Sequence, residues 1–161
     1  MREPTIKRTS QKYMQIIYPD TPITEPSDLY LAGPTPRDPD VLSWRIEALD
    51  ILNQNHFPGI VCVPERESWK DYNYIDQVEW EYKGLQKALK IIFWVPRDLK
   101  TLPGLTTNVE FGYWLALRPH NVYYGRPINA PKTRYLDWLY QKHTGHQPKD
   151  TLQSLLMEAL I

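Results

Sequence analysis

Several features that mark large protein classes are scarce in this chain. It contains 1 cysteine, Cys62, so no disulfide can form within the chain, which fits a reducing, cytoplasmic compartment. The 19 basic and 19 acidic residues cancel, which argues against a protein held on nucleic acid by its overall charge. No apolar run approaches the length of a membrane span, and the N-terminus shows no signal-peptide pattern, so we expect no membrane partner.

Proline, by contrast, is frequent, with 15 residues in 161 against a background of about 5%. Most prolines fall between apolar or periodic segments, which indicates a compact domain with defined loops. Residues 1–27 are polar and contain several prolines, with one apolar patch at 14–18, and we expect an extended N-terminal arm. Residues 28–161 are long enough for one domain with a buried core.

From residue 28 onward, short apolar segments alternate with amphipathic ones. Strands are predicted at 29–32, 59–63, 90–95 and 121–124. Helices are predicted from 38–40 to 52, at 75–89, at 107–117 and, as a C-terminal helical extension, at 132–143 and 149–160. This alternation predicts an α/β fold, in which a parallel sheet is flanked by helices on both faces.

Three loops follow the carboxyl ends of predicted strands, at 33–37, 96–110 and 125–129. In open parallel sheets, ligands bind outside the carboxyl ends of the strands, so these loops are expected to converge on a small-molecule site. Gly33 and Pro34 in the first loop are candidates for substrate binding. Arg37, in the same loop, could hold a 5′-phosphate, because guanidinium pairs well with phosphate oxygens. The alternative is a solvated arginine at a helix start.

Glu110 is the main candidate for chemistry. It follows the turn-rich segment 103–109 and falls in what the sequence predicts to be the first turn of a helix. A carboxylate at that place is favoured in its ionised form by the helix dipole, and an ionised, fixed carboxylate can attack a sugar carbon. Alternatively, Thr107 and Glu110 form a capping box, in which Glu110 only satisfies a backbone N–H.

The predicted helix 75–89 supplies a second carboxylate. Ile75, Val78, Tyr82, Leu85 and Leu89 recur at helical spacing and predict its buried face. Glu79 and Glu81 both fall at the margin of that face, so periodicity does not choose between them. Either one is also compatible with a solvated glutamate.

Four motifs, in this order and spacing, resemble the nucleoside 2-deoxyribosyltransferase superfamily, in a small divergent branch. They are Tyr30-Leu31-Ala32-Gly33-Pro34, Trp80-Glu81-Tyr82-Lys83-Gly84-Leu85, Asn108-Val109-Glu110-Phe111-Gly112-Tyr113 and Gly125-Arg126-Pro127-Ile128-Asn129. The resemblance covers about residues 28–130. It implies a flavodoxin-like, Rossmann-like sheet and an enzyme that acts on the N-glycosidic bond of nucleosides or nucleoside monophosphates.

The resemblance also implies roles for single residues. Glu110 matches the nucleophile, Glu81 matches the acid that engages the nucleobase, and Tyr30 lies near the tyrosine that orients the nucleophile. Asn129 resembles an asparagine that a neighbouring subunit lends to the sugar pocket, which implies a homo-oligomer. One position departs from the family, which usually has an acidic residue where this chain has Gly104, and Asp98 or Asn108 could supply the missing contact.

A second reason to expect a homo-oligomer is the apolar C-terminal stripe, which looks too wide for a small sheet to cover; it consists of Leu152, Leu155, Leu156, Ala159 and Leu160. His143 and His146 lack the further ligands that a metal site needs, so neither a metal nor a cofactor is expected.

The residues fit several functions. A transferase and a hydrolase would use the same carboxylates, so the sequence does not separate them. Hydrolysis of another N-riboside, such as a nicotinamide dinucleotide, is a further possibility. A catalytically silent nucleotide-binding module, suggested by Gly104, and a pure assembly protein are the alternatives of other classes.

Overall fold

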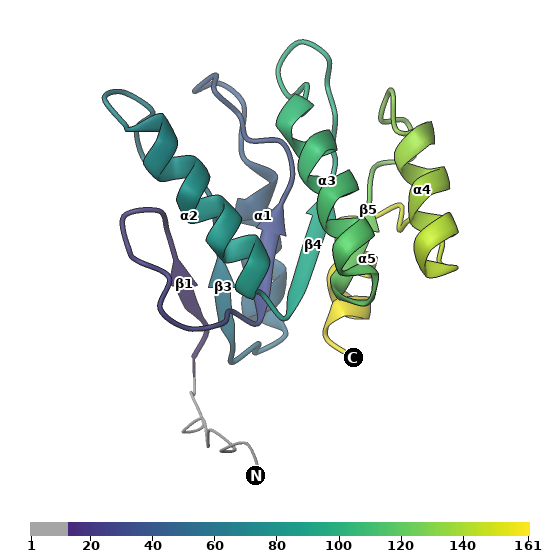
Figure 1. Ribbon diagram of the computed structural model, residues 1–161, viewed down its shortest axis with the longest axis horizontal. Helices are drawn as coiled ribbons and strands as arrows, with labels where there is room; N and C mark the ends of the chain where they lie inside the picture. The colour runs from purple at the N-terminus through teal and green to yellow at the C-terminus, as the bar shows by residue number, and fades with distance from the viewer. Residues whose placement is uncertain (1–12) are drawn as a thin grey trace, which may run out of the picture.

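The computed structural model describes residues 13–161, which form a five-stranded parallel sheet between two layers of helices (Figure 1). The strands are β1 (Gln15–Ile17), β2 (Leu29–Ala32), β3 (Ile60–Cys62), β4 (Lys90–Trp94) and β5 (Val122–Gly125). The helices are α1 (Trp44–Gln54), α2 (Tyr74–Lys87), α3 (Leu105–Leu117), α4 (Arg134–Thr144) and α5 (Leu152–Ala159), with a short 3-10 helix, η1 (Pro119–Asn121). The α/β fold predicted from the sequence is confirmed.

Alternate residues of each strand serve two separate cores, because side chains in a strand point to opposite faces of the sheet. On β2, Leu29 and Leu31 face α1 and α5, whereas Tyr30 and Ala32 face α2, α3 and α4. In Figure 1 the second group of helices lies in front of the sheet. Both faces are therefore covered, as the near-continuous apolar character of the strands requires.

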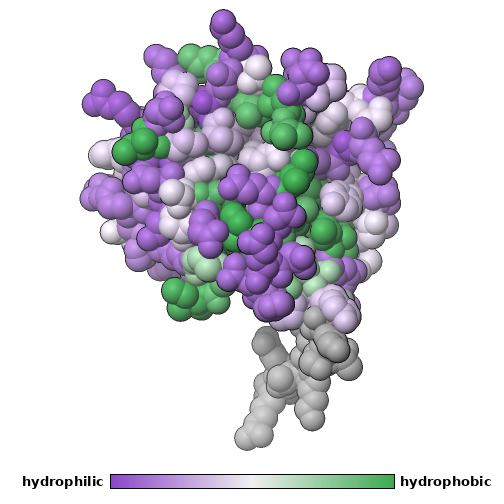
Figure 2. Space-filling model, turned by 180° about the vertical axis from the view of Figure 1, so that it is seen from behind, coloured by the Kyte–Doolittle hydropathy of each residue, from purple (hydrophilic) through white to green (hydrophobic). Residues whose placement is uncertain are grey.

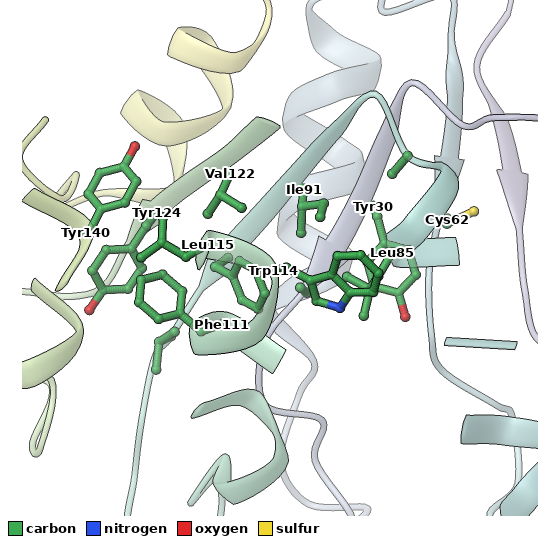
Figure 3. Close-up of a cluster of buried hydrophobic side chains, with 14 of the residues drawn as sticks. Tyr30, Cys62, Leu85, Ile91, Phe111, Trp114, Leu115, Val122, Tyr124 and Tyr140 are labelled. Carbon is green, nitrogen blue, oxygen red and sulfur yellow. The ribbon is translucent and has the colours of Figure 1, made fainter. Parts of the chain in front are cut away.

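The core under α3 and α4 is mainly aromatic (Figure 3). Phe93, Phe111, Tyr124 and Tyr140 form a chain of rings whose centroids are 5.2, 4.8 and 5.5 Å apart in that order. Two of these contacts are edge-to-face, the geometry that the ring quadrupole favours. This packing fixes α3 on the sheet and hence the direction in which its N-terminal half points.

The strand order is β1-β3-β2-β4-β5. The chain leaves β2 for β3 on one side, and then α2 carries it across to β4 on the other side of β2. The order of the strands therefore reverses between β2 and β4. In doubly wound sheets, ligands bind in the crevice at this reversal, outside the carboxyl ends of the strands.

The described part of the expected N-terminal arm is packed onto the domain. β1 pairs in parallel with β3 along Gln15–Ile17, and Ile23 is 4% exposed beside Tyr30 and Trp80. The indole N–H of Trp80 also donates to the carbonyl of Thr21 at 2.8 Å. A strand of three residues is too short to show alternation, so its sequence gave no sign of it. The rest of the expected arm, residues 1–12, lies outside the described residues.

The start of α1 and the packing of α5 differ from the sequence predictions. α1 begins at Trp44 rather than at 38–40, because the Ser43 side chain accepts from the backbone N–H of Arg45 and caps the helix there. α5 buries Leu152, Leu155, Leu156 and Ala159 against α1 and the sheet. The interpretation of this stripe as a free surface for assembly was therefore wrong.

The predicted buried face of α2 was also wrong. Ile75, Val78, Tyr82 and Leu89 are 40–61% exposed, and of the predicted stripe Leu85 alone is buried. The helix instead packs through Gln77, Trp80, Gly84 and Leu85. Gly84 permits this, since a Cβ at that position would come within 2.6 Å of the Tyr30 ring. Rotating the buried face brings Glu81 toward the carboxyl ends of the strands and leaves Glu79 exposed.

The outer edge of β5 is paired with a loop. The backbone N–H of Arg126 donates to the carbonyl of Lys149, and the N–H of Lys149 donates to the carbonyl of Tyr124. Within residues 13–161, none of the helices is both long and apolar enough to cross a bilayer.

Candidate active site

A cleft of about 440 Å³ opens at the reversal point between β2 and β4. Its walls come from the β2–α1 loop, from the β3–α2 loop with the first half of α2, and from the β4–α3 loop with the first turns of α3. The volume suits a ligand of small-molecule size. Of the three loops predicted to converge, those after β2 and β4 line this cleft.

Glu81 of α2 and Glu110 of α3 meet at the cleft, and a hydrogen bond joins their carboxyl groups. Burial and the neighbouring charge of Glu81 raise the pKa of Glu110 from 4.5 to about 8. Burial also raises the pKa of Glu81, although its hydrogen bond with Gln77 opposes the shift. Two carboxyls in contact cannot both ionise easily, so near neutral pH the pair retains a proton.

The position of Glu110 differs from the expectation in two ways. α3 begins at Leu105, so Glu110 lies in its second turn, and the helix has Gly104 at its N-cap with no side-chain cap. Thr107 and Glu110 therefore do not form a capping box. The expectation of an ionised Glu110 was also wrong, because burial and the charge of Glu81 raise its pKa to about 8 and so outweigh the helix dipole, which acts mainly within the first turn.

Gln77 holds Glu81 in place. Its amide N–H donates to Glu81 Oε1 at 2.6 Å, and its amide oxygen accepts from Arg66 Nε at 2.7 Å. Gln77 and Glu81 are four residues apart and share one face of α2. The Gln77 amide thus links Arg66, in the β3–α2 loop, to Glu81 by two hydrogen bonds.

Arg45 is a cleft residue that sequence reasoning missed. It is 1% exposed and donates to the carbonyls of Leu31 and Gly33 at 2.8 and 2.9 Å, to Thr35 at 3.0 Å and to Glu65 at 2.7 Å. These bonds tie the β2–α1 loop to α1. Its charge also lowers the pKa of both Glu81 and Glu110, against the effect of burial. A single arginine at the first turn of a helix gave no sequence signal of this role.

Tyr30 lies near the two carboxyls and lines the same cleft. It is 1% exposed and packs against Trp80 with ring centroids 6.3 Å apart. Burial, with Glu81 and Glu110 as further causes, raises the pKa of its phenol well above the usual value. Tyr30 therefore stays protonated and can donate a hydrogen bond in the site.

Two glycines let backbone form the cleft wall. Gly33 has no room for a side chain, since a Cβ would lie 2.1 Å from the carbonyl oxygen of Trp94. Gly104 has φ +63°, and a Cβ there would lie 2.8 Å from the Pro34 ring. Position 104, where the family usually has an acidic residue, thus holds a left-handed backbone that glycine adopts most easily. Gly33, Pro34 and Gly104 all line the cleft.

Arg37 also lines the cleft. Its guanidinium lies 3.8 Å from the centroid of the Trp69 ring, and its charge lowers the pKa of Glu81. Trp69 in turn packs edge-to-face on Tyr72, a further cleft residue. The contact with Trp69 holds an exposed arginine at the cleft.

Two expected contacts do not line the cleft in the described part of the chain. Asn108 accepts a hydrogen bond from Arg97, which is buried and also donates to the carbonyl of Lys132. Asn129 is exposed in the β5–α4 loop. Arg126, from the same motif, pairs with Asp137 at 3.0 Å and holds that loop to α4.

No group of three or more metal-ligating side chains occurs among residues 13–161. His143 and His146 are exposed. Cys62 is buried, and burial raises the pKa of its thiol, as expected of a small core side chain. The ionisable side chains that line the cleft are two carboxyls, three tyrosine phenols, two arginines and a lysine: Glu81, Glu110, Tyr30, Tyr72, Tyr74, Arg37, Arg45 and Lys100.

Comparison with known proteins shows the family of this chain. The family described as nucleoside 2-deoxyribosyltransferase like matches residues 26–126, which include β2 to β5 and both cleft glutamates. A search of curated proteins gave no match. Since the family match spans more than half of the 161 residues, the chain belongs to the nucleoside 2-deoxyribosyltransferase-like family.

Proposed function

We propose that this protein cleaves or exchanges the N-glycosidic bond of nucleosides or nucleoside monophosphates, with Glu110 as the nucleophile. The observation that carries the proposal is the pair Glu81–Glu110, which faces a cleft of about 440 Å³ and retains a proton near neutral pH. Breaking a C–N glycosidic bond calls for both an attacking carboxylate and an acid that protonates the departing base. One protonated pair provides both.

The proposed first step moves one proton and exchanges one bond. Glu110 passes its proton across the hydrogen bond to Glu81, and Glu81 gives a proton to the departing nitrogen of the base. As the bond from C1′ to that nitrogen breaks through an oxocarbenium-like state, a carboxylate oxygen of Glu110 bonds to C1′. Ionised Glu110 arises only as the proton leaves, so a buried nucleophile is never left as an uncompensated charge.

In the second step, an acceptor base or water attacks C1′ of the glycosyl-enzyme, and Glu81 takes the proton that the attacking group loses. The bond from C1′ to Glu110 breaks, and the carboxyl pair regains its starting charge. Transferase and hydrolase differ only in which acceptor reaches C1′.

Three other residues position the reaction. Tyr30 stays protonated near the pair and can orient the carboxylate of Glu110. Arg45 offsets part of the negative charge of the pair and holds the loop that forms one wall. Arg37, held by Trp69, is the candidate for a 5′-phosphate contact.

The test is incubation with a panel of deoxynucleosides, ribonucleosides and their 5′-monophosphates, with and without a free acceptor base, followed by chromatography of the bases. Release of base in water supports a hydrolase, and incorporation of the added base supports a transferase. Binding of these compounds, detected by calorimetry, without any release or exchange would contradict the proposal and indicate a nucleotide-binding module.

A further inference from the structure

We propose that Arg118 is a positioning residue for the carboxyl pair: it ties the C-terminal end of α2 to the end of α3 and thereby sets how closely Glu81 approaches Glu110. Arg118 is the C-cap residue of α3. Its effect on the geometry of the pair can be tested without a substrate, whereas its effect on the reaction rests on the proposed function.

The guanidinium of Arg118 binds the last turn of a helix other than its own. One terminal nitrogen donates to the carbonyls of Leu85 and Gln86 at 2.7 and 2.9 Å, and the other donates to the carbonyl of Ala88 at 2.6 Å. The last carbonyls of a helix have no intrahelical donor. The backbone N–H of Leu89, which could extend α2, donates to the β1–β2 loop instead. Arg118 therefore supplies donors that the backbone of α2 lacks.

The charge of Arg118 serves the end of this helix rather than a carboxylate. Within the part of the chain that the structure describes, none of the ion pairs includes Arg118. A cation beside the last carbonyls of a helix is stabilised by the negative end of the helix dipole. The side chain is half-buried, and burial lowers the pKa of its guanidinium. Most charged side chains are solvated, and on the side of the sheet away from α2 and α3 hydrophilic groups cover much of the surface (Figure 2).

The two helices that Arg118 joins are the ones that carry the carboxyl pair. α2 and α3 run parallel to each other in front of the sheet, because each of them connects two parallel strands (Figure 1). Glu81 comes four residues before Leu85, about 6 Å along α2, and Glu110 comes eight residues before Arg118, about 12 Å along α3. A movement at the joined ends is therefore transmitted over a short length of rigid helix to the pair.

A second contact between the helices is weaker. The hydroxyls of Tyr82 and Tyr113 are 3.1 Å apart, and the Tyr82 ring centroid lies 5.3 Å from that of Trp114. Both tyrosines are more than 40% exposed, so water competes for their hydrogen bond. Hydrogen bonds from a guanidinium are charge-assisted and roughly twice as strong as neutral ones. The bonds of Arg118 are therefore the main polar tie between α2 and α3.

The carboxyl pair is sensitive to a shift of α2. A hydrogen bond between two carboxyl oxygens weakens when they move apart by more than a few tenths of an ångström. The groups that act on Glu110 are Glu81 of α2 and Arg45 of α1, with the phenol of Tyr30 on β2 beside them. Of these, Glu81 alone lies on α2. Because the charge of Glu81 raises the pKa of Glu110, a loosened α2 should let that pKa fall from about 8 toward 4.5.

Urea unfolding in two backgrounds tests the proposal without a substrate. In the wild-type background, Glu110→Gln should gain stability relative to its parent as the pH rises from 4.5 to about 8. In the Arg118→Met background this gain should be smaller and should level off at a lower pH. The matched control is Arg134→Met, which removes an exposed arginine of α4 and should leave the gain unchanged.

A purely structural Arg118 would lower the stability of parent and Glu110→Gln equally at every pH, so an unchanged gain would overturn the proposal. If Arg118→Met does not unfold cooperatively, Arg118→Lys takes its place. Lysine keeps the charge but has no two-nitrogen fork, so it should reduce the gain to a smaller extent.

Steady-state base release measures the consequence for the reaction. Arg118→Met should lower kcat by roughly 10²-fold, the effect of a misplacement of about 1 Å, and should change KM little because the residues that line the cleft are intact. Arg118→Lys should recover part of the rate. A wild-type kcat in folded Arg118→Met would overturn the proposal. If the wild-type chain released no base, the proposed function would fail, and the urea comparison would still decide the role of Arg118.

Discussion

Glu81 and Glu110 come from different helices, yet a hydrogen bond joins their carboxyl groups at the cleft. The Gln77 amide on α2 donates a hydrogen bond to Glu81, and the buried charge of Arg45 lowers the pKa of both carboxyls. The protonation of the pair therefore depends on burial and on two neighbours at once.

Glu110→Gln should keep the fold and lower the rate of glycosidic cleavage by several orders of magnitude, because an amide cannot act as the covalent nucleophile. Base release under single-turnover conditions measures the loss. Glu79→Gln, an exposed position two residues before Glu81, is the matched control and should cleave at the wild-type rate. Unchanged cleavage by folded Glu110→Gln would remove Glu110 from the mechanism.

Stability should fall as the pH rises from about 4.5 to about 8. Burial and Glu81 raise the pKa of Glu110 from 4.5 to about 8, so over this range the folded state binds a proton that the unfolded state has lost. The contribution of Glu110 to the free energy of unfolding is complete below pH 4.5. It is lost as the pH rises to about 8, at up to roughly 1.4 kcal/mol per pH unit. Urea unfolding across this range should show that Glu110→Gln gains stability relative to wild type as the pH rises. If the free energy of unfolding of the two proteins changed with pH in parallel, the raised pKa of Glu110 would be contradicted.

Arg37→Ala should raise the KM for a nucleoside monophosphate roughly tenfold or more, from loss of a charge-assisted hydrogen bond to the phosphate. The KM for the matching nucleoside should not change. Arg134→Ala, an exposed arginine at the start of α4, is the control for net charge. Equal effects on both substrates would assign Arg37 a structural role, and a general preference for nucleosides would show that the proposed phosphate contact is absent.

Arg45→Met should lower the free energy of unfolding by about 3 kcal/mol or more, because it leaves Glu65 without its charged partner and the carbonyls of Leu31 and Gly33 without their donor. Arg134→Met provides the exposed comparison and should unfold at nearly the wild-type urea concentration. If Arg45→Met changed the free energy of unfolding only slightly, the β2–α1 loop would be held by packing alone.

Gly104→Ala should lower the free energy of unfolding by about 1–2 kcal/mol, because alanine is strained in a left-handed backbone and its Cβ would clash with the Pro34 ring. Gly112→Ala is the matched control: it lies in α3, and a Cβ there meets nothing within 4 Å. That change should stabilise the helix by about 0.5–1 kcal/mol. Urea unfolding measures the stability of both variants. If Gly104→Ala and Gly112→Ala changed the free energy of unfolding equally, the backbone at position 104 would not be strained.

The order of strands and helices from residue 28 could be predicted because apolar strands and proline-bounded loops leave a strong local signal. The face of α2 could not, because the periodicity rule takes every apolar stripe for the core. Ile75, Val78 and Tyr82 have helical spacing but are exposed. Gly84 makes the close approach to Tyr30, and because it has no side chain it does not contribute to a hydrophobic pattern.

For the cleft, the sequence predicted Glu110 from its motif; helical periodicity left Glu79 and Glu81 equivalent, and the family resemblance selected Glu81. The choice between them depends on how α2 rotates on the sheet, which is a tertiary property. Arg45 could not be predicted at all, since its partners Leu31, Gly33 and Glu65 are distant in sequence or are backbone carbonyls. The role of Asn129 beside a neighbouring subunit stays a prediction.

The edges of the sheet bear on how the protein avoids aggregation. β1 offers three residues at one edge, and at the other edge the backbone of Lys149 occupies part of β5. Strands so short or already paired are poor templates for adding another chain, so growth into fibrils by edge pairing is disfavoured.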